Sequence, residues 1–355
     1  MRIGAILSFL LTAIVSISCS SKAQKAGNED QGSIIKFVEH QADKRVDVMI
    51  DGKLFTSYIW PDKVYKPVLF PILTPSGTPV TRGFPLQPRA GERQDHLHHV
   101  GSWFNYGNVN GVDYWGNGSE GERNPKGGVI KHVSISQLKG GKGEGSFITT
   151  ASWIDPAGKE VIKERTEFHF IARGSTRIID RIATWSSAGE KVTFTDTKEG
   201  SFGIRVARQL ELPSKENITL TDAQGNPTTV KAMSNVGVTG MYKSSEGDTG
   251  EGVWSKRAKW MNLYGSIGDE KISLVIADHP KNLSYPTYWH ARGYGLFAAN
   301  PFGVKDFTNG KQELNYTIPV GGSLITRYRI ILTSGKHLTD AEINAYSDEF
   351  ATKYK

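Results

Sequence analysis

Short segments that alternate between apolar and polar residues run through most of the chain, and this pattern predicts β-strands. The first two, KRVDVMI and KLFTSYIW, flank Asp51 and Gly52, a pair typical of a two-residue hairpin turn. Residues 155–158, DPAG, predict a second hairpin. Further strands are expected at VIKHVSISQL, GSFITTASWI, VIKERTEFHFIA, TRIIDRIATWSS and KVTFTDTKEG, and over residues 201–211, 217–222, 257–264, 270–277, 293–299, 312–318 and 323–333.

Helical periodicity is confined to the C-terminal segment LTDAEINAYSDEFATKY. Thr339 and Glu342 have the spacing of a capping box, in which the two side chains satisfy the first backbone N–H groups of a helix. Ile343, Tyr346 and Phe350 then share one apolar face, so this helix is expected to pack against the sheets.

The N-terminus resembles the leader of an exported lipoprotein. Residues 1–19, MRIGAILSFLLTAIVSISC, place Arg2 before an apolar run and end in small residues and Cys19, the predicted lipidation site. The alternative is an ordinary cleavable signal with an incidental cysteine. Residues 20–33 are polar and small and read as a tether. Residues 34–355 then predict one large antiparallel β-sandwich with a C-terminal helix, anchored to a membrane on the periplasmic or cell-surface side.

Composition narrows the function classes. Cys19 is the only cysteine, so the folded domain can have no disulfide, thiolate nucleophile or cysteine metal site. The net charge of +7 is spread among many acidic residues, which argues against nucleic-acid binding. The chain also lacks a Gly-x-Ser-x-Gly elbow, a His-Glu-x-x-His motif, a phosphate loop and a dinucleotide fingerprint.

Residues 93–115, RQDHLHHVGSWFNYGNVNGVDYW, hold three of the nine histidines. If this segment is extended, His96 and His98 point to one side and His99 to the other. Such a pair can chelate a metal or exchange protons beside a bound sugar, with Asp95 orienting one ring. The rest of the segment offers flat faces and hydrogen-bonding groups for a sugar, unless it is a glycine-rich loop over buried aromatics. These candidates are Trp103, Asn108, Asn110, Asp113 and Trp115.

Two further segments carry candidate chemistry. In YPTYWHARGYGLFAANPFG, an extended backbone places His290 and Arg292 on one face, and an arginine fork suits a carboxylate or oxyanion. The alternative is a core strand with a polar entry. In DTKEGSFGIRVARQLEL, Glu199 stands where a strand begins, as a candidate general base or acid or as a solvated turn residue.

A proline-rich segment, residues 67–95, leads into the histidine segment. A long ordered loop of this kind is usually a lid or part of a site. Its Arg82 is expected either to bind an anionic group of a ligand or to pair with an acid of the protein.

The motifs DHLHHVGSWFNYGNVNGVDYW, DTKEGSFGIRV and PTYWHARGYGLFAANPFG resemble an uncharacterised bacterial family labelled methane oxygenase PmoA. The resemblance covers nearly the whole exported domain. It implies a galactose-mutarotase-like β-supersandwich whose concave face holds the site, in a setting of carbohydrate breakdown. The family pattern usually reads Asp-His-Pro-His-His-Arg, whereas this chain has Leu97 and Val100, and Tyr106 stands where a histidine is common. A metal or proton relay that needs that histidine therefore lacks it here.

The leading hypothesis is an exported carbohydrate-active enzyme that acts on a glycoside, oligosaccharide or modified sugar by hydrolysis, elimination or epimerisation. The alternatives are a non-catalytic glycan-binding lipoprotein and a metal-dependent hydrolase using His96, His98 and His290. No cofactor is expected, with a divalent metal only in the last alternative. The expected partners are a small carbohydrate and a lipid anchor, without nucleic acid.

The predicted site follows from these segments by analogy with supersandwich enzymes. The catalytic set is His96, His98, His290 and Glu199. The substrate-binding set is Arg82, Asp95, His99, Trp103, Asn108, Asn110, Asp113, Trp115, Trp289, Arg292 and Tyr294. Within it, Arg82 and Arg292 are expected to hold an anionic oxygen, and Trp115 or Trp289 to stack on the sugar ring.

Overall fold

The computed structural model describes residues 1, 32–117, 124–230 and 235–354. The expected leader and Cys19 lie outside these residues, so export and lipidation stay predictions. Residues Gly32–Lys355 form one compact unit. No helix in the described ranges is both long enough and apolar enough to span a membrane.

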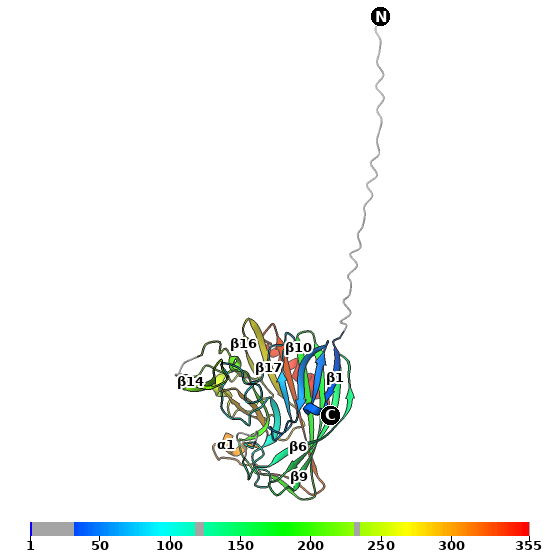
Figure 1. Ribbon diagram of the computed structural model, residues 1–355, viewed down its shortest axis with the longest axis vertical. Coiled ribbons are helices and arrows are strands. Elements are labelled where there is room, and N and C mark those ends of the chain that lie inside the picture. Colours follow the sequence, from blue (N-terminus) through cyan, green and yellow to red (C-terminus); the bar gives the residue numbers. More distant parts are fainter. Residues whose placement is uncertain (2–31, 118–123, 231–234, 355) are drawn as a thin grey trace. The chain divides into compact units, whose positions relative to one another are not determined.

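Two large antiparallel sheets make up this unit (Figure 1). In order across the nine-stranded sheet lie β18 (Tyr288–Arg292), β19 (Leu296–Asn300), β12 (Gly200–Arg205), β5 (Ser102–Tyr106), β4 (Val68–Ile72), β3 (Lys53–Ile59), β2 (Arg45–Ile50), β1 (Ile34–His40) and β7 (Gly141–Lys142). The eight-stranded sheet has the order β15 (Met241–Ser244), β16 (Trp260–Ile267), β17 (Glu270–Asp278), β21 (Ser323–Ser334), β10 (Thr176–Ser187), β9 (Glu160–Arg173), β8 (Glu144–Ile154) and β6 (Val129–Lys139).

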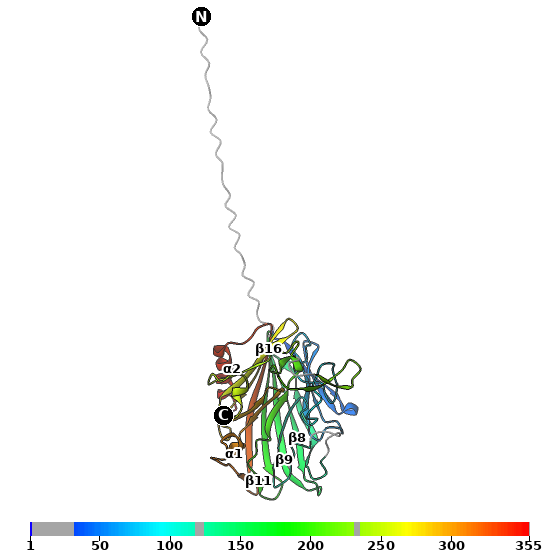
Figure 2. The same ribbon diagram turned by 90° about the vertical axis from the view of Figure 1, so that its left-hand side faces the viewer.

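The remaining elements are small. Two-stranded sheets pair β11 (Val192–Phe194) with β20 (Tyr316–Ile318) and β13 (Ile218–Thr221) with β14 (Pro227–Val230). The helices are η1 (Gln41–Asp43), η3 (Arg208–Leu210), η4 (Gly250–Val253), α1 (Val304–Phe307) and α2 (Asp340–Thr352). The predicted capping box is present, because the Thr339 side chain accepts from the Glu342 backbone N–H. The helix α2 buries Ile343 and Phe350 against the outer side of the eight-stranded sheet (Figure 2).

The main core lies between the two sheets, where alternate residues of facing strands interdigitate. The predicted all-β sandwich with a C-terminal helix is therefore confirmed. The first predicted hairpin is present as well: Asp51 and Gly52 join β2 to β3 with φ angles of 51° and 77°. Positive φ at both turn positions is the geometry that an Asp-Gly pair favours.

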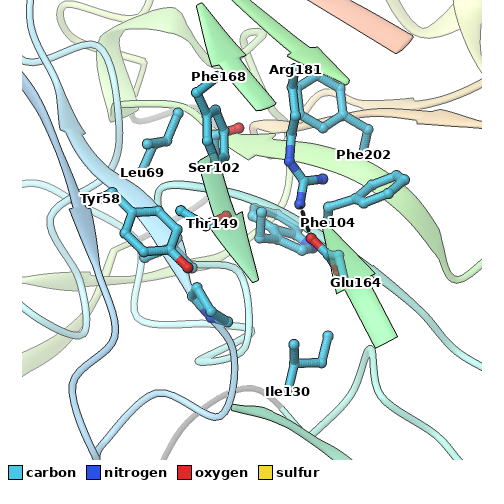
Figure 3. A pocket seen from close by; sticks show the side chains of 13 residues that line it. Tyr58, Leu69, Ser102, Phe104, Ile130, Thr149, Glu164, Phe168, Arg181 and Phe202 are labelled. Atoms are coloured by element: carbon cyan, nitrogen blue, oxygen red, sulfur yellow. Dashed lines mark hydrogen bonds and ion pairs between the residues drawn. The ribbon is translucent and has the colours of Figure 1, made fainter. Parts of the chain in front are cut away.

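A small polar island lies inside this core (Figure 3). Glu164 accepts hydrogen bonds from Arg181 at 2.7 Å and from the indole nitrogens of Trp153 and Trp185 at 2.9 and 3.2 Å. The cavity beside them measures about 20 Å³, which is room for about one water molecule. This buried ion pair is a structural feature of the sandwich that the sequence pattern did not predict.

The strand pleat decides which side chains leave the core. On β5, Phe104 points inward to the ring of Trp185, and its neighbour Trp103 points outward. Cross-strand pairing aligns Trp103 with Gly203 and His290 with Ala298. The outward face of β5, β12, β19 and β18 therefore brings residues from the three sequence motifs together.

Candidate functional site

The histidine segment forms a turn. The backbone N–H of His99 donates to the carbonyl of His96 at 2.9 Å, and His96 has a φ of 43°, in the left-handed region. The prediction that His96 and His98 lie on one side of an extended segment is therefore wrong. The reason lies outside the segment, in an arginine that draws the carbonyls of the turn inward.

That arginine is Arg82, which is 1% exposed. Its guanidinium donates to the carbonyl oxygens of Asp95, His96 and His99 at 2.7, 2.9 and 3.0 Å. It also donates to Oδ1 of Asp95 at 2.6 Å. Arg82 thus shapes the turn and is enclosed by it, which corrects its predicted role as a ligand-binding residue in favour of the alternative that it pairs with an acid of the protein.

Asp95 is held between two arginines. Its Oδ1 lies 2.6 Å from Arg82 and 2.5 Å from Arg205, and its Oδ2 lies 3.3 Å from Nδ1 of His96. Burial alone would raise the pKa of Asp95, but the contact with His96 and the two guanidinium charges hold this pKa well below its usual range. Asp95 is therefore a permanent carboxylate that lies beside the His96 ring.

Aromatic rings lie in parallel planes above Trp103. The ring of His99 lies 5.1 Å from that of Trp103, and the ring of His96 lies 4.8 Å from His99 and 5.0 Å from Tyr294. His98 meets His99 edge-on at 4.3 Å. The side chain of His96 is 40% exposed. His96 is thus the accessible member of a stack whose lower members are buried.

Burial separates contact residues from supporting residues. Trp103, Trp115 and His99 are each 2% exposed, so they lie beneath the accessible layer. The prediction that they contact a sugar directly is corrected. His99 packs against His96 and His98, and the two tryptophans pack against His99. Burial, followed by the charges of nearby groups, lowers the pKa of His99 well below its usual value. Its Nδ1 accepts from Arg205 at 3.2 Å, as expected for a neutral ring beside a cation.

The strand β18 supplies the neighbouring part of this face. His290 and Arg292 share its outward side as predicted, and Tyr294 follows in the turn to β19. Nδ1 of His290 donates to the carbonyl of Lys198 at 2.9 Å, and burial lowers the pKa of His290 to about 3. His290 is therefore a neutral ring whose Nε2 carries the lone pair.

Tyr294 links the two parts of the site. Its ring lies against His96, and the guanidinium carbons of Arg205 and Arg292 lie 5.0 and 6.0 Å from its centre. Burial raises the pKa of Tyr294 to about 12, and Glu199 and Asp95 act in the same direction against the two arginines. Glu199, with a side chain 38% exposed, is therefore close enough for its charge to act on the Tyr294 hydroxyl.

Four residues that were predicted to bind ligand make hydrogen bonds within the protein. Trp289 is 0% exposed and its indole nitrogen donates to the carbonyl of Ala258, so it cannot stack on a sugar. Asn108 and Asp113 accept from backbone N–H groups of their own loop, and Asn110 bridges to the backbone of β11. Asn108, Asn110 and Asp113 therefore shape the loop after β5, and their contact with a ligand stays a prediction.

Two site residues were not predicted. Arg205 is 0% exposed and binds both Asp95 and His99. One indication of this role was present in the sequence. Arg205 lies in a segment with strand alternation, where an arginine side chain must either face solvent or pair with a carboxylate. Trp254, which lies 5.7 Å beneath the guanidinium of Arg292, comes from the loop after η4 and had no sequence signal.

Metal binding was an alternative for the histidines. Within residues 32–117, 124–230 and 235–354, no three His, Cys, Asp or Glu side chains are grouped so that they could hold an ion. The ring planes of His96 and His99 are 3° apart, so these two rings stack face to face.

The buried neutral state of His290 predicts a dependence of stability on pH. Its pKa is about 3 in the folded protein and about 6.5 in an unfolded chain. Between these values only the unfolded chain binds the proton, so stability is full above pH 6.5 and falls as the pH drops. We expect the His290 contribution to cost about 2 kcal/mol at pH 5.

Urea unfolding at pH 7 and pH 5 measures this loss. His290→Gln should reduce the difference between the two pH values by that amount. The matched control is His169→Gln, because His169 lies on the sheet surface beside Glu144. An identical pH difference in the His290 variant and the parent contradicts the prediction.

A family model matches most of the chain. A family model described as "Family of unknown function (DUF6807)" matches residues 45–348. No curated protein matches the chain. The matching family model does not carry the methane-oxygenase label that the motifs suggested.

Similar solved structures include carbohydrate enzymes. The galactosidase domain of an alpha-galactosidase–sucrose kinase shares 8% identity with a TM-score of 0.40, over 84% of this chain and 41% of its own. A beta-arabinopyranosidase shares 13% identity with a TM-score of 0.33, over 88% of this chain and 40% of its own. A galactose mutarotase related enzyme from Lactobacillus acidophilus shares 9% identity with a TM-score of 0.27, over 85% and 97%. The chain spans about two fifths of the length of the first two.

Proposed function

We propose that this chain, which belongs to the family of unknown function DUF6807, is an exported carbohydrate-active enzyme. Its substrate would lie on the outward face of β5, β12, β19 and β18. The observation that carries the proposal is the accessible ring of His96, held 3.3 Å from the permanently ionised Asp95. An accessible imidazole beside a carboxylate is an arrangement that suits general acid–base catalysis.

Each accessible residue has a role in this proposal. His96 takes up and returns a proton as the first acid–base residue of the reaction. Glu199 serves as the second acid or base, close enough for its charge to act on Tyr294. The Tyr294 hydroxyl stays protonated at a pKa of about 12, so it donates a hydrogen bond to a substrate oxygen. Two proton carriers and a donor suffice for hydrolysis, elimination or epimerisation of a sugar.

The burial of the tryptophans favours an enzyme over a binding module. A glycan-binding lipoprotein would use accessible flat rings as a platform. Trp103, Trp115 and Trp289 are all buried, whereas two titratable side chains, His96 and Glu199, are part-exposed. The accessible groups therefore suit proton transfer better than stacking.

Incubation of the purified protein with a panel of oligosaccharides tests this function. We expect conversion of at least one glycan, detected by chromatography of the products or by proton exchange into the sugar in deuterated water. Parallel incubations with added divalent metal and with chelator show whether a metal is needed. If no glycan changes under either condition, the enzymatic proposal fails, and binding without turnover would support the glycan-binding alternative.

A further inference from the structure

The guanidinium of Arg292 faces the site, and no carboxylate of the described residues pairs with it. It lies between the rings of Trp254 and Tyr294, at 5.7 and 6.0 Å from their centres. Its side chain is half-buried, and it makes no ion pair or hydrogen bond with any residue in the described ranges. Placing a cation partly out of water is costly, and two aromatic faces offset only part of that cost. The arrangement is typical of an arginine that binds an anionic group of a ligand.

The surrounding charges strengthen this reading. The buried Arg82 and Arg205 share the single carboxylate of Asp95. Glu199 lies 3.4 Å from Lys198, so its charge is already matched. Among the described residues of this face, cations therefore outnumber carboxylates, and no described acid pairs with Arg292.

Two other acids nearby are also engaged. Glu211 is held by Arg93 at 2.7 Å and by Arg208 at 2.5 Å. Glu251 accepts from the backbone N–H of Gly293 at 3.1 Å and makes no ion pair with Arg292. An anionic ligand would balance the charge that these contacts leave on Arg292.

We propose that the sugar bound at this site carries a carboxylate and that Arg292 binds it. The substrate class is then a uronic acid or an oligosaccharide that contains one. This inference rests on the proposed function and names its substrate. A carboxylate fits best because the planar guanidinium fork matches its two oxygens in a bidentate pair.

Calorimetric titration of the full domain with short oligosaccharides tests the inference. The probes are trimers of galacturonic and glucuronic acid, the neutral trimers of galactose and glucose, and a sulfated galactose trimer. We expect one acidic trimer to bind at least about 10-fold more tightly than its neutral counterpart, as for hydrogen bonds to a charged group. This preference should weaken as salt is added.

Variants show whether the preference for acidic trimers depends on Arg292 or on the overall positive charge of the protein. Arg292→Met should abolish the preference for the acidic trimer. Arg292→Lys should keep part of it, because lysine is a point charge without the fork. The matched control is Arg165→Met, which removes the same charge from the exposed Arg165–Glu167 pair and should leave the preference unchanged.

The outcomes are distinguishable. Equal affinity for acidic and neutral trimers overturns the inference and leaves the proposed function standing, as does a preference that survives in Arg292→Met. Equal binding of the sulfated trimer overturns the assignment of a carboxylate. Absence of binding for all trimers counts against both this inference and the proposed function.

Discussion

Replacing His96 with asparagine is expected to lower the turnover of the converted glycan by about 100- to 10,000-fold. The reason is that asparagine has no side-chain group that exchanges protons in this way, whereas the imidazole of His96 is accessible and lies 3.3 Å from Asp95. Asparagine is the appropriate replacement because His96 has a φ of 43°, and asparagine adopts the left-handed region more readily than most residues. Steady-state kinetics on the glycan that the parent converts measures the effect.

The control for this variant is a second histidine beside a carboxylate. His169 on β9 lies 3.1 Å from Glu144, away from the outward face of the other sheet. His169→Asn should keep full turnover, and both variants should unfold at similar urea concentrations. A His96→Asn protein that is folded and retains turnover within a few-fold of the parent would falsify the proposed role of His96. A bell-shaped pH profile that loses one limb in His96→Asn supports proton transfer over a purely structural role.

Replacing Arg82 with methionine is expected to lower the free energy of unfolding by about 3–5 kcal/mol. Methionine has similar length but no donor, so the carbonyl oxygens of Asp95, His96 and His99 lose a common partner inside the protein. Asp95 also loses one of its two arginines. This cost is a large part of the stability of an ordinary domain. Urea unfolding followed by tryptophan fluorescence measures it.

Arg165→Met provides the scale for that measurement. Arg165 is 47% exposed and pairs with Glu167 on the surface, where an ion pair contributes about 0–1 kcal/mol. If Arg82→Met costs no more than this control, the turn does not depend on Arg82 as we infer. Arg292→Met should also cost little, since the Arg292 side chain makes no hydrogen bond with the described residues. A large loss of unfolding free energy for Arg82→Met and a small one for Arg292→Met would show that Arg82 maintains the structure of the site, whereas Arg292 does not.

Much of the fold was predictable because strand signals are local. Alternation along a segment places a residue such as Phe168 inside and His169 outside, whatever the strand later pairs with. The Asp51–Gly52 turn and the cap at Thr339 depend on residues at most three positions apart. The same local rule correctly placed His290 and Arg292 on one face of β18.

The site was predictable only in part, because its geometry depends on contacts between distant segments. Nothing within residues 95–99 announces that Arg82 turns their carbonyls inward, and this contact replaces the extended conformation with a turn. For Trp289, the local rule itself was not applied. An aromatic residue beside His290 was predicted to stack on a sugar, but neighbouring residues of a strand point to opposite faces, and Trp289 lies in the core.

The sequence by itself determined the β-sandwich, its terminal helix and the three segments that carry chemistry, because these follow from residue type and spacing along the chain. Only the tertiary structure decided which of those residues are accessible. Burial and the sharing of one carboxylate by Arg82 and Arg205 depend on the packing of strands far apart in sequence. That packing leaves His96, Tyr294 and Arg292 accessible on one face and buries Trp103, Trp115 and Trp289 beneath or behind it.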